Sequence, residues 1–299
     1  MTVTIGGKKL PNPVGVASGT FGYGSEYERL IGLDNLGAVY TKAVTVEPRP
    51  GNGIPRIIET PSGMLNAIGL ANVGLDAFIE AKIPYFEQLS CPVIVNVAGS
   101  MGEDYLKVVE RLDEYNAVWG YEINVSCPNV KHGCLAFGSD PQQVESLTKQ
   151  LRAKTRKPLI VKLTPNVTNI GEIAAGAEQG GADAVSCINT LLGMVIDIKK
   201  KKPVLQNNTG GLSGPAIRPV GIAAVYNVSR CVSIPVIGLG GIMCASDAIE
   251  YLLAGASAIQ VGTGTFVDPG IPEKVLIGIK DYMKEEKMHS LSDFHGYLP

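Results

Sequence analysis

A cysteine between two asparagines is the first candidate for chemistry in this chain. The stretch NVSCPN runs from Asn124 to Asn129 and places Cys127 three residues after one carboxamide and two before the other. A free cysteine is most often a buried and inert side chain. A thiol can also act as an acid or base over a ligand that neighbouring amides position. The stretch therefore suggests a catalytic role for Cys127, which depends on the elements around it.

The composition limits the class of protein. The 299 residues are 45% hydrophobic and 18% charged, with a net charge of −2, which is typical of a globular protein with a large core. This charge gives no electrostatic argument for binding nucleic acid or an anionic membrane. We identify no signal peptide and no unbroken apolar run of the roughly 20 residues that a membrane helix needs. We therefore expect a soluble, cytoplasmic protein.

Six cysteines and three histidines restrict the possible reactive centres. Cys127 and Cys134 are seven residues apart without a second close pair, which argues against a zinc or iron–sulfur site in this chain. Three histidines argue against a Ser-His-Asp triad, so catalysis should depend on cysteine, lysine, asparagine or a cofactor. The other four cysteines lie in or beside apolar runs, and we expect them to be core thiols: Cys91, Cys187, Cys231 and Cys244.

A regular series of short, β-branched runs supplies the elements that would position these residues. They predict eight strands, at residues 14–17, 38–41, 93–97, 121–125, 159–163, 184–189, 236–240 and 258–262. Helix-like segments lie between most of them, and nearly continuous apolar strands are typical of parallel sheets buried on both faces. The series predicts an α/β protein with a (β/α)8 TIM barrel in one domain, residues 1–299, and a doubly wound open sheet is the alternative.

In such a barrel, the active site lies at the carboxyl ends of the strands. A lone lysine at a strand end is usually a solvated rim residue. Here, none of the predicted strand ends carries a carboxylate, whereas two lysines and three asparagines lie there: Lys42, Lys162, Asn96, Asn124 and Asn189. Five such groups around one mouth indicate a polar site.

Three glycine-rich segments follow the last predicted strands, and we expect them to be loops: NTGGLSG (208–214), GLGGI (238–242) and VGTGTF (261–266). Barrels often bind phosphate with backbone N–H groups of the last two loops. Two enzyme classes fit such a site. One is an aldolase or isomerase with Lys162 or Lys42 as a Schiff base, and the other is a flavin enzyme whose phosphate belongs to FMN. Asparagines suit the imide edge of a flavin, and Schiff-base chemistry would call for nearby carboxylates.

Several segments resemble the dihydroorotate dehydrogenase family, over nearly the whole length of the chain. They are TKAVTVEPRPGN (41–52), ETPSGMLNAIGLAN (59–72), NVSCPNVKHG (124–133), VKLTPNV (161–167), INTLLG (188–193), GGLSGPAIRP (210–219), GLGGI and VGTGTF. The resemblance implies an FMN-binding barrel that oxidises dihydroorotate to orotate in pyrimidine biosynthesis. The catalytic base is serine in the membrane-bound class and cysteine in the soluble class 1, so Cys127 implies class 1. EPRPGN and KHGCLAFG resemble class 1B.

The resemblance also implies roles for individual residues. Cys127 matches the base that removes the C5 proton while hydride passes from C6 to the flavin. The residues implied for the substrate are Lys42, Asn66, Ala67, Ile68, Gly69, Leu70, Asn124, Asn189 and Thr190. Those implied for FMN are Ser18, Lys42, Ala43, Asn96, Asn124, Lys162, Ile188, Gly214, Gly240, Gly241, Gly262 and Thr263.

Class 1B membership implies a partner. Such catalytic chains work with a second subunit that carries FAD and a [2Fe-2S] cluster, through which electrons reach NAD⁺. We therefore expect a homodimer of this chain within a heterotetramer, without a metal in the chain and without a nucleic-acid or membrane partner. The alternatives are a fumarate-dependent class 1A enzyme, a related FMN barrel acting on another dihydropyrimidine, and a barrel that only binds.

Overall fold

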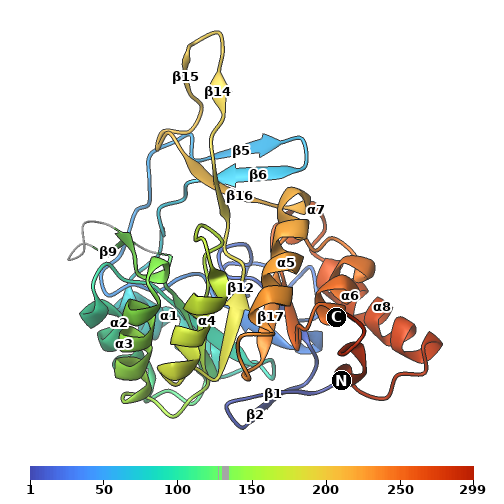
Figure 1. The fold of residues 1–299 in the computed structure, drawn as a ribbon. Helices are drawn as coiled ribbons and strands as arrows, with labels where there is room; N and C mark the ends of the chain where they lie inside the picture. Colours follow the sequence, from blue (N-terminus) through green and yellow to red (C-terminus); the bar gives the residue numbers. More distant parts are fainter. Residues whose placement is uncertain (127, 130–134) are drawn as a thin grey trace.

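Eight parallel strands close into a barrel at the centre of the molecule (Figure 1), in a computed structural model that describes residues 1–126, 128–129 and 135–299. The strands follow one another around the barrel in chain order, and the last pairs with the first. They are β3 (Val14–Val16), β4 (Ala38–Tyr40), β7 (Val93–Val97), β8 (Gly120–Asn124), β11 (Leu159–Lys162), β12 (Ala184–Cys187), β17 (Val236–Leu239) and β18 (Ala258–Val261). The predicted TIM barrel is confirmed, and the doubly wound alternative is wrong.

All of these strands except β7 end one or two residues earlier than predicted. The residues just beyond them keep some of the ladder, as the Ala17 N–H shows by donating to the Val261 carbonyl at 2.8 Å. Differences of this size are ordinary at the ends of elements. Every residue of the eight strands is buried, as expected for a parallel sheet covered on its outer face by helices.

Helices surround the barrel and bury one face each. In α2, for example, the buried side chains are Tyr105, Val108, Val109 and Leu112, and the charged ones lie on the other side. The longer helices are α1 (Leu75–Phe86), α2 (Gly102–Leu112), α3 (Pro141–Arg152), α4 (Ile170–Gln179), α5 (Arg218–Val228), α6 (Ala245–Leu253) and α8 (Ile271–Glu285). The short ones are η1 (Leu33–Asn35), η3 (Phe137–Ser139), η4 (Pro215–Ile217), α7 (Gly264–Val267) and η5 (Leu291–Phe294).

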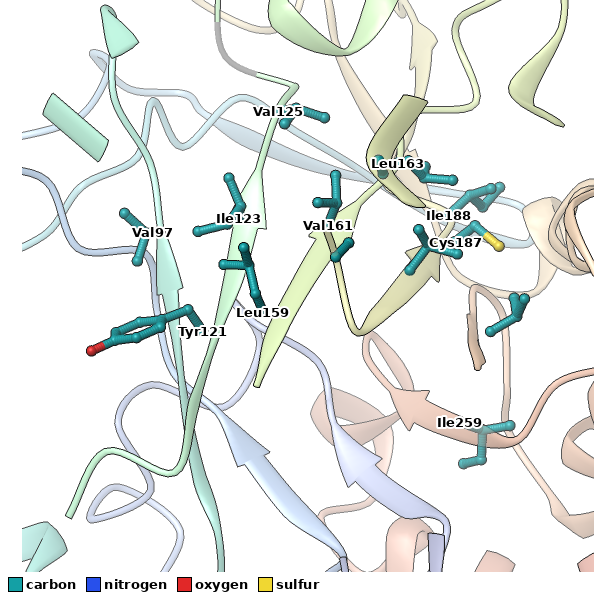
Figure 2. Close-up of a cluster of buried hydrophobic side chains, with 14 of the residues drawn as sticks. Val97, Tyr121, Ile123, Val125, Leu159, Val161, Leu163, Cys187, Ile188 and Ile259 are labelled. Carbon is teal, nitrogen blue, oxygen red and sulfur yellow. The ribbon is translucent and has the colours of Figure 1, made fainter. Parts of the chain in front are cut away.

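Side chains of the strands alternate between two hydrophobic regions. One set faces the helices and includes Val97, Tyr121, Ile123, Val161 and Cys187 (Figure 2). The other set faces the barrel axis and is covered at the amino ends of the strands by the hairpin of β1 (Val3–Ile5) and β2 (Lys8–Leu10). We call this second set the hydrophobic floor: Val3, Ile5, Leu10, Ala38, Tyr40, Ile94, Ile160, Ala184, Ile237 and Ala258.

A separate antiparallel sheet lies over the opposite, carboxyl end of the barrel (Figure 1). Its order is β13 (Leu191–Gly193), β16 (Gly210–Ser213), β6 (Gly63–Asn66) and β5 (Ile57–Thr60). It combines the connection that follows β4 with the connection that follows β12. The loop expected at residues 208–214 is therefore wrong in its second half, because GGLS pairs with both β6 and β13 as strand β16.

Two small hairpins complete the described elements. β14 (Ile196–Asp197) and β15 (Lys202–Pro203) extend farthest from the barrel (Figure 1), and the lysines between them are exposed. β9 (Pro128–Asn129) pairs with β10 (Leu135–Ala136). Among the described helices, none is long and apolar enough to cross a membrane.

The expectation of four core thiols is correct for Cys91 and Cys187, which are buried. It is wrong for Cys231 and Cys244, which are exposed. Cys231 lies in the turn after α5, and Cys244 is the N-cap residue of α6. Both lie beside apolar runs in the sequence but at the ends of elements, where the chain reaches the surface.

Candidate active site at the carboxyl ends of the barrel strands

A layer of polar side chains fills the barrel between the hydrophobic floor and the strand ends. Its centre is Glu122 on β8, which is 0% exposed. The carboxylate accepts hydrogen bonds from Asn96 Nδ2 at 2.7 Å, Gln260 Nε2 at 2.8 Å and Ser186 Oγ at 2.9 Å. The ammonium of Lys162 lies 3.6 Å from the same carboxylate. We call these five residues the polar layer; four of them come from other strands than Glu122 and face one buried negative charge.

Lys162 connects this layer to the mouth of the barrel. It is 4% exposed, and its Nζ donates to Ser18 Oγ, just beyond β3, at 3.1 Å. Two of the residues predicted for the cofactor therefore lie in contact, although 144 positions separate them in the chain. An ammonium so placed can stabilise negative charge on a ligand above it.

Asn96 leaves one polar atom available. Its Nδ2 donates to Glu122, whereas its Oδ1 is buried and has no hydrogen-bond partner among the described residues. A buried acceptor without a donor is costly unless a ligand supplies one. Asn96 thus offers an acceptor to a bound group with an N–H.

Lys42 begins the connection that follows β4. Its backbone N–H donates to the Gly22 carbonyl at 2.8 Å, and its side chain is half-buried. Within the described part of the chain, no side chain pairs with its ammonium. The cation is therefore available to an anionic ligand.

The asparagines of two strand ends meet directly. Asn189 Nδ2 lies 3.3 Å from Asn124 Oδ1 and donates to Ser126 Oγ at 2.9 Å. The Ser126 N–H donates back to Asn124 Oδ1 at 3.2 Å, and the Tyr105 hydroxyl donates to the Asn124 carbonyl from helix α2 at 2.9 Å. These contacts hold both carboxamides at one side of the mouth.

The overlying sheet adds two more predicted residues to this cluster. Asn66 ends β6 opposite Gly211, and its Nδ2 lies 3.3 Å from the Gly211 carbonyl. A Cβ at Gly211 would lie 2.0 Å from Thr190 Oγ1, so only glycine allows Thr190 to approach. The Thr190 N–H in turn donates to Asn189 Oδ1 at 2.9 Å. Asn66, Thr190 and Asn189 thus lie in one continuous set of contacts.

The segment after Asn66 continues over the barrel. Asn52 holds it, because its N–H donates to the Ile68 carbonyl and its Nδ2 to the Ala67 carbonyl, both at 3.0 Å. Gly69 then takes a positive φ of 74°, and Leu70 packs on Ala43 and Ala98 just beyond the strand ends. This segment forms one wall of the mouth.

Three glycine-rich segments converge on the far side of the mouth. Gly214 and Gly241 both have positive φ, and a Cβ at Gly241 would lie 2.8 Å from the Gly214 carbonyl. Thr263 Oγ1 donates to Ser213 Oγ at 2.7 Å, which ties the segment after β18 to β16. A Cβ at Gly262 would meet only Ala17, at 3.5 Å. Glycine backbones that approach one another this closely suit a phosphate group.

Cys127 lies outside the described residues. The Ile188 side chain packs in the hydrophobic core (Figure 2), so a ligand could contact this residue only through its backbone.

Burial raises the pKa of the thiols of Cys91 and Cys187 to about 12. Neither is a thiolate near neutral pH, and neither can act as a base there. Burial, with the nearby negative charge of Glu122, also raises the pKa of Tyr40 above its usual range. The described cysteines of the core are therefore structural.

Comparison with known proteins identifies the family. The family model for dihydroorotate dehydrogenase matches residues 1–283. The chain belongs to the dihydroorotate dehydrogenase family. It is 50% identical over 298 residues to the dihydroorotate dehydrogenase B (NAD(+)) catalytic subunit of Geotalea uraniireducens (strain Rf4), and the match covers 100% of this chain and 98% of that one. The protein of the same name in Pelobacter propionicus is 51% identical over 298 residues, with 100% and 98% covered.

The sequence was thus sufficient to recognise the family, but it did not predict every polar residue of the candidate site. Glu122, Ser186 and Gln260 lie within strands and not at their ends, where we looked for polar residues. One signal could have found Glu122 and Gln260. Glutamate and glutamine interrupt the otherwise apolar runs YEIN and AIQV, and a charged or amide side chain in a strand buried on both faces must point at a polar partner.

Proposed function

We propose that this chain is the catalytic subunit of an NAD⁺-linked dihydroorotate dehydrogenase, which oxidises (S)-dihydroorotate to orotate in pyrimidine biosynthesis. Family membership and the full-length similarity to relatives of that name support the proposal. The observation that carries it is the convergence of Asn66, Asn124, Asn189 and Thr190 from three separate segments. Carboxamides and a hydroxyl offer the alternating donors and acceptors that a pyrimidine ring requires.

The cofactor of this reaction is proposed to be FMN, and the mouth of the barrel fits it. Asn96 Oδ1, which has no partner among the described residues, suits the imide N–H of a flavin, and the close glycine backbones suit its phosphate. When bound, FMN supplies the acceptor for the two electrons that leave substrate C6 as a hydride. The residues proposed to hold it are Ser18, Lys42, Ala43, Asn96, Asn124, Lys162, Ile188, Gly214, Gly240, Gly241, Gly262 and Thr263.

Substrate binding is proposed to involve both charge and shape. The ammonium of Lys42, which no described side chain pairs with, would pair with the carboxylate of dihydroorotate, which dihydrouracil lacks. Asn66, Asn124, Asn189 and Thr190 would hold the ring by hydrogen bonds. The wall formed by Ala67, Ile68, Gly69 and Leu70 would exclude water from it.

Cys127 is proposed as the base that takes the C5 proton. An unperturbed thiol has a pKa of about 8.5, so only a few per cent is thiolate at pH 7. The rate of flavin reduction should therefore rise with pH through the pKa of this thiol. The proposal rests on the NVSCPN sequence and on the asparagines that flank it.

The path of the electrons beyond this chain is also proposed. The relatives' name, a catalytic subunit of an NAD(+) enzyme, supports a separate partner that passes electrons to NAD⁺. We propose that this partner carries FAD and a [2Fe-2S] cluster. Residues 1–299 would form one FMN-binding domain, two copies of which form the core of a cytoplasmic heterotetramer.

A visible spectrum of the purified chain, followed by anaerobic addition of dihydroorotate, tests the proposal. We expect a flavin band that dihydroorotate bleaches and dihydrouracil does not. Reoxidation by NAD⁺ should require the partner subunit, whereas rapid reoxidation by fumarate alone would indicate a class 1A enzyme. A colourless protein that cannot be reconstituted with FMN would contradict the flavin assignment.

A further inference from the structure

Glu122 has no part in the proposed reaction, yet the polar layer is built around it. Its carboxylate is wholly buried and accepts three hydrogen bonds, from Asn96 on β7, Ser186 on β12 and Gln260 on β18. The donors of all three bonds are neutral. Among the described residues, Lys162 is the one charged group that lies within ion-pair distance of it, at 3.6 Å.

Stability alone does not explain a charge at this position. Transferring a carboxylate from water to the protein interior costs on the order of several kcal/mol. Well-packed apolar residues are often at least as stabilising as a buried ion pair. In the hydrophobic floor of the same barrel, the axis is filled by apolar side chains, among them Ile94, Ile160 and Ala184. The change from apolar to charged occurs only next to the residues of the mouth.

The geometry around Lys162 indicates what the charge does. Its ammonium has Ser18 Oγ at 3.1 Å on one side and the Glu122 carboxylate at 3.6 Å on the other. The carboxylate is thus close enough to offset much of the positive charge but does not take the ammonium as a hydrogen-bond donor. In a buried site, such charges act on a neighbouring ligand with little screening.

We propose that Glu122 is a positioning residue that sets how much positive charge Lys162 presents to the flavin, and so lowers the two-electron reduction potential of the bound cofactor. The proposal rests on the proposed function for the identity of the cofactor. Two-electron reduction by hydride adds negative charge to the flavin, which Lys162 stabilises and Glu122 opposes. A lower potential favours passing the electrons on to a partner.

Glu122→Gln tests this, because it removes the charge and nearly keeps the shape. The potential of the FMN-loaded protein would be measured by equilibration with a reference dye, at one pH, beside the wild type. We expect the equilibrium between oxidised and reduced flavin to shift at least tenfold toward the reduced form, which is a rise of about 30 mV for a two-electron couple.

Ser186→Ala is the matched control. It removes one hydrogen bond to the same carboxylate and keeps the charge. The negative charge of Glu122 is then less dispersed and acts more strongly on Lys162. We expect the flavin equilibrium to shift about twofold toward the oxidised form, opposite in sign to Glu122→Gln. A rise in both variants would show that any disturbance of the polar layer raises the potential, and would overturn the proposal.

The remaining outcomes are also decisive. A Glu122→Gln protein that binds FMN with the wild-type potential overturns the proposal and leaves the proposed function intact. If Glu122→Gln does not fold, Ser186→Ala decides: a lowered potential supports the proposal, and an unchanged or raised one overturns it. A wild-type chain that binds no FMN contradicts the proposed function instead.

Discussion

The two ends of the barrel interior contain different chemistry on the same strands. At the amino ends, Ile94, Ile160 and Ala184 pack against the β1–β2 hairpin in the hydrophobic floor. Two residues further along, the same strands carry Asn96, Lys162 and Ser186 around Glu122. Each of these three strands therefore contributes to the hydrophobic floor through one inward residue and to the polar layer through the next. This separation allows either end to be changed without the other.

The largest effect should come from Cys127→Ser, at the polar end. General base catalysis contributes roughly 10²- to 10⁴-fold, so flavin reduction by dihydroorotate should slow by at least about 100-fold at pH 7. The FMN content and the unfolding temperature should stay at wild-type values. Anaerobic stopped-flow absorbance measures the rate, and a variant that reduced its flavin at the wild-type rate would remove Cys127 from the role of base.

Ile160→Ala should have the opposite profile, because it changes only the hydrophobic floor. Truncating a buried isoleucine typically costs about 2 to 5 kcal/mol of unfolding free energy, and Ile160 is fully buried. Denaturant unfolding measures the loss, and flavin reduction per folded molecule should be unchanged. The matched control is Ile198→Ala, at a side chain that is 83% exposed, which should change stability by less than about 0.5 kcal/mol.

Gly211→Ala should affect substrate binding without affecting the cofactor. The new Cβ would lie 2.0 Å from Thr190 Oγ1, so the Thr190 hydroxyl must leave its position. Loss of one positioned hydrogen bond, about 1 to 2 kcal/mol, predicts a roughly tenfold weaker affinity for dihydroorotate at unchanged FMN affinity. Gly102→Ala is the control, because its Cβ would meet nothing closer than 3.8 Å. Equal affinities in the two variants would separate Thr190 from the substrate site.

The smallest effect should be on the pH dependence of stability, through Cys187, which is buried between the strands and the helices. Burial raises the pKa of this thiol to about 12 from 9.0, so the folded protein keeps the proton longer than the unfolded chain. The resulting stability is complete below pH 9 and is lost as the pH rises toward 12. The unfolding free energy of Cys187→Ala should therefore fall less steeply than that of the wild type over this range. Parallel slopes would show that the thiol does not titrate in the unfolding transition.

Much of this arrangement could be predicted from the sequence because its signals are local. Each barrel strand is a short apolar run between helices, and the topology alone places the residues at the end of the run near the mouth. That reasoning brought Lys42, Lys162, Asn96, Asn124 and Asn189 to one end of the barrel. It could also predict that three glycine-rich segments meet there.

The missed parts depend on contacts between distant segments. A local pattern can mark Glu122 as a charge inside a buried strand, but it cannot identify the three partners that other strands supply. Likewise, GGLS has the composition of a loop, and it becomes strand β16 only because β6 and β13 are available on either side. The exposure of Cys231 and Cys244 depends on where the neighbouring elements end. Tertiary context decides each of these cases.

The pairing of Asn66 with Gly211 also has a consequence for the order of folding. These residues are 145 positions apart, so the candidate site joins the first quarter of the chain to its third quarter. A chain emerging from the ribosome cannot complete this candidate site before residue 213 has left the exit tunnel, however complete its first strands are. Contacts at such separation close late and slowly. Retention of a labelled substrate analogue by stalled chains of increasing length would therefore report when the fold is finished.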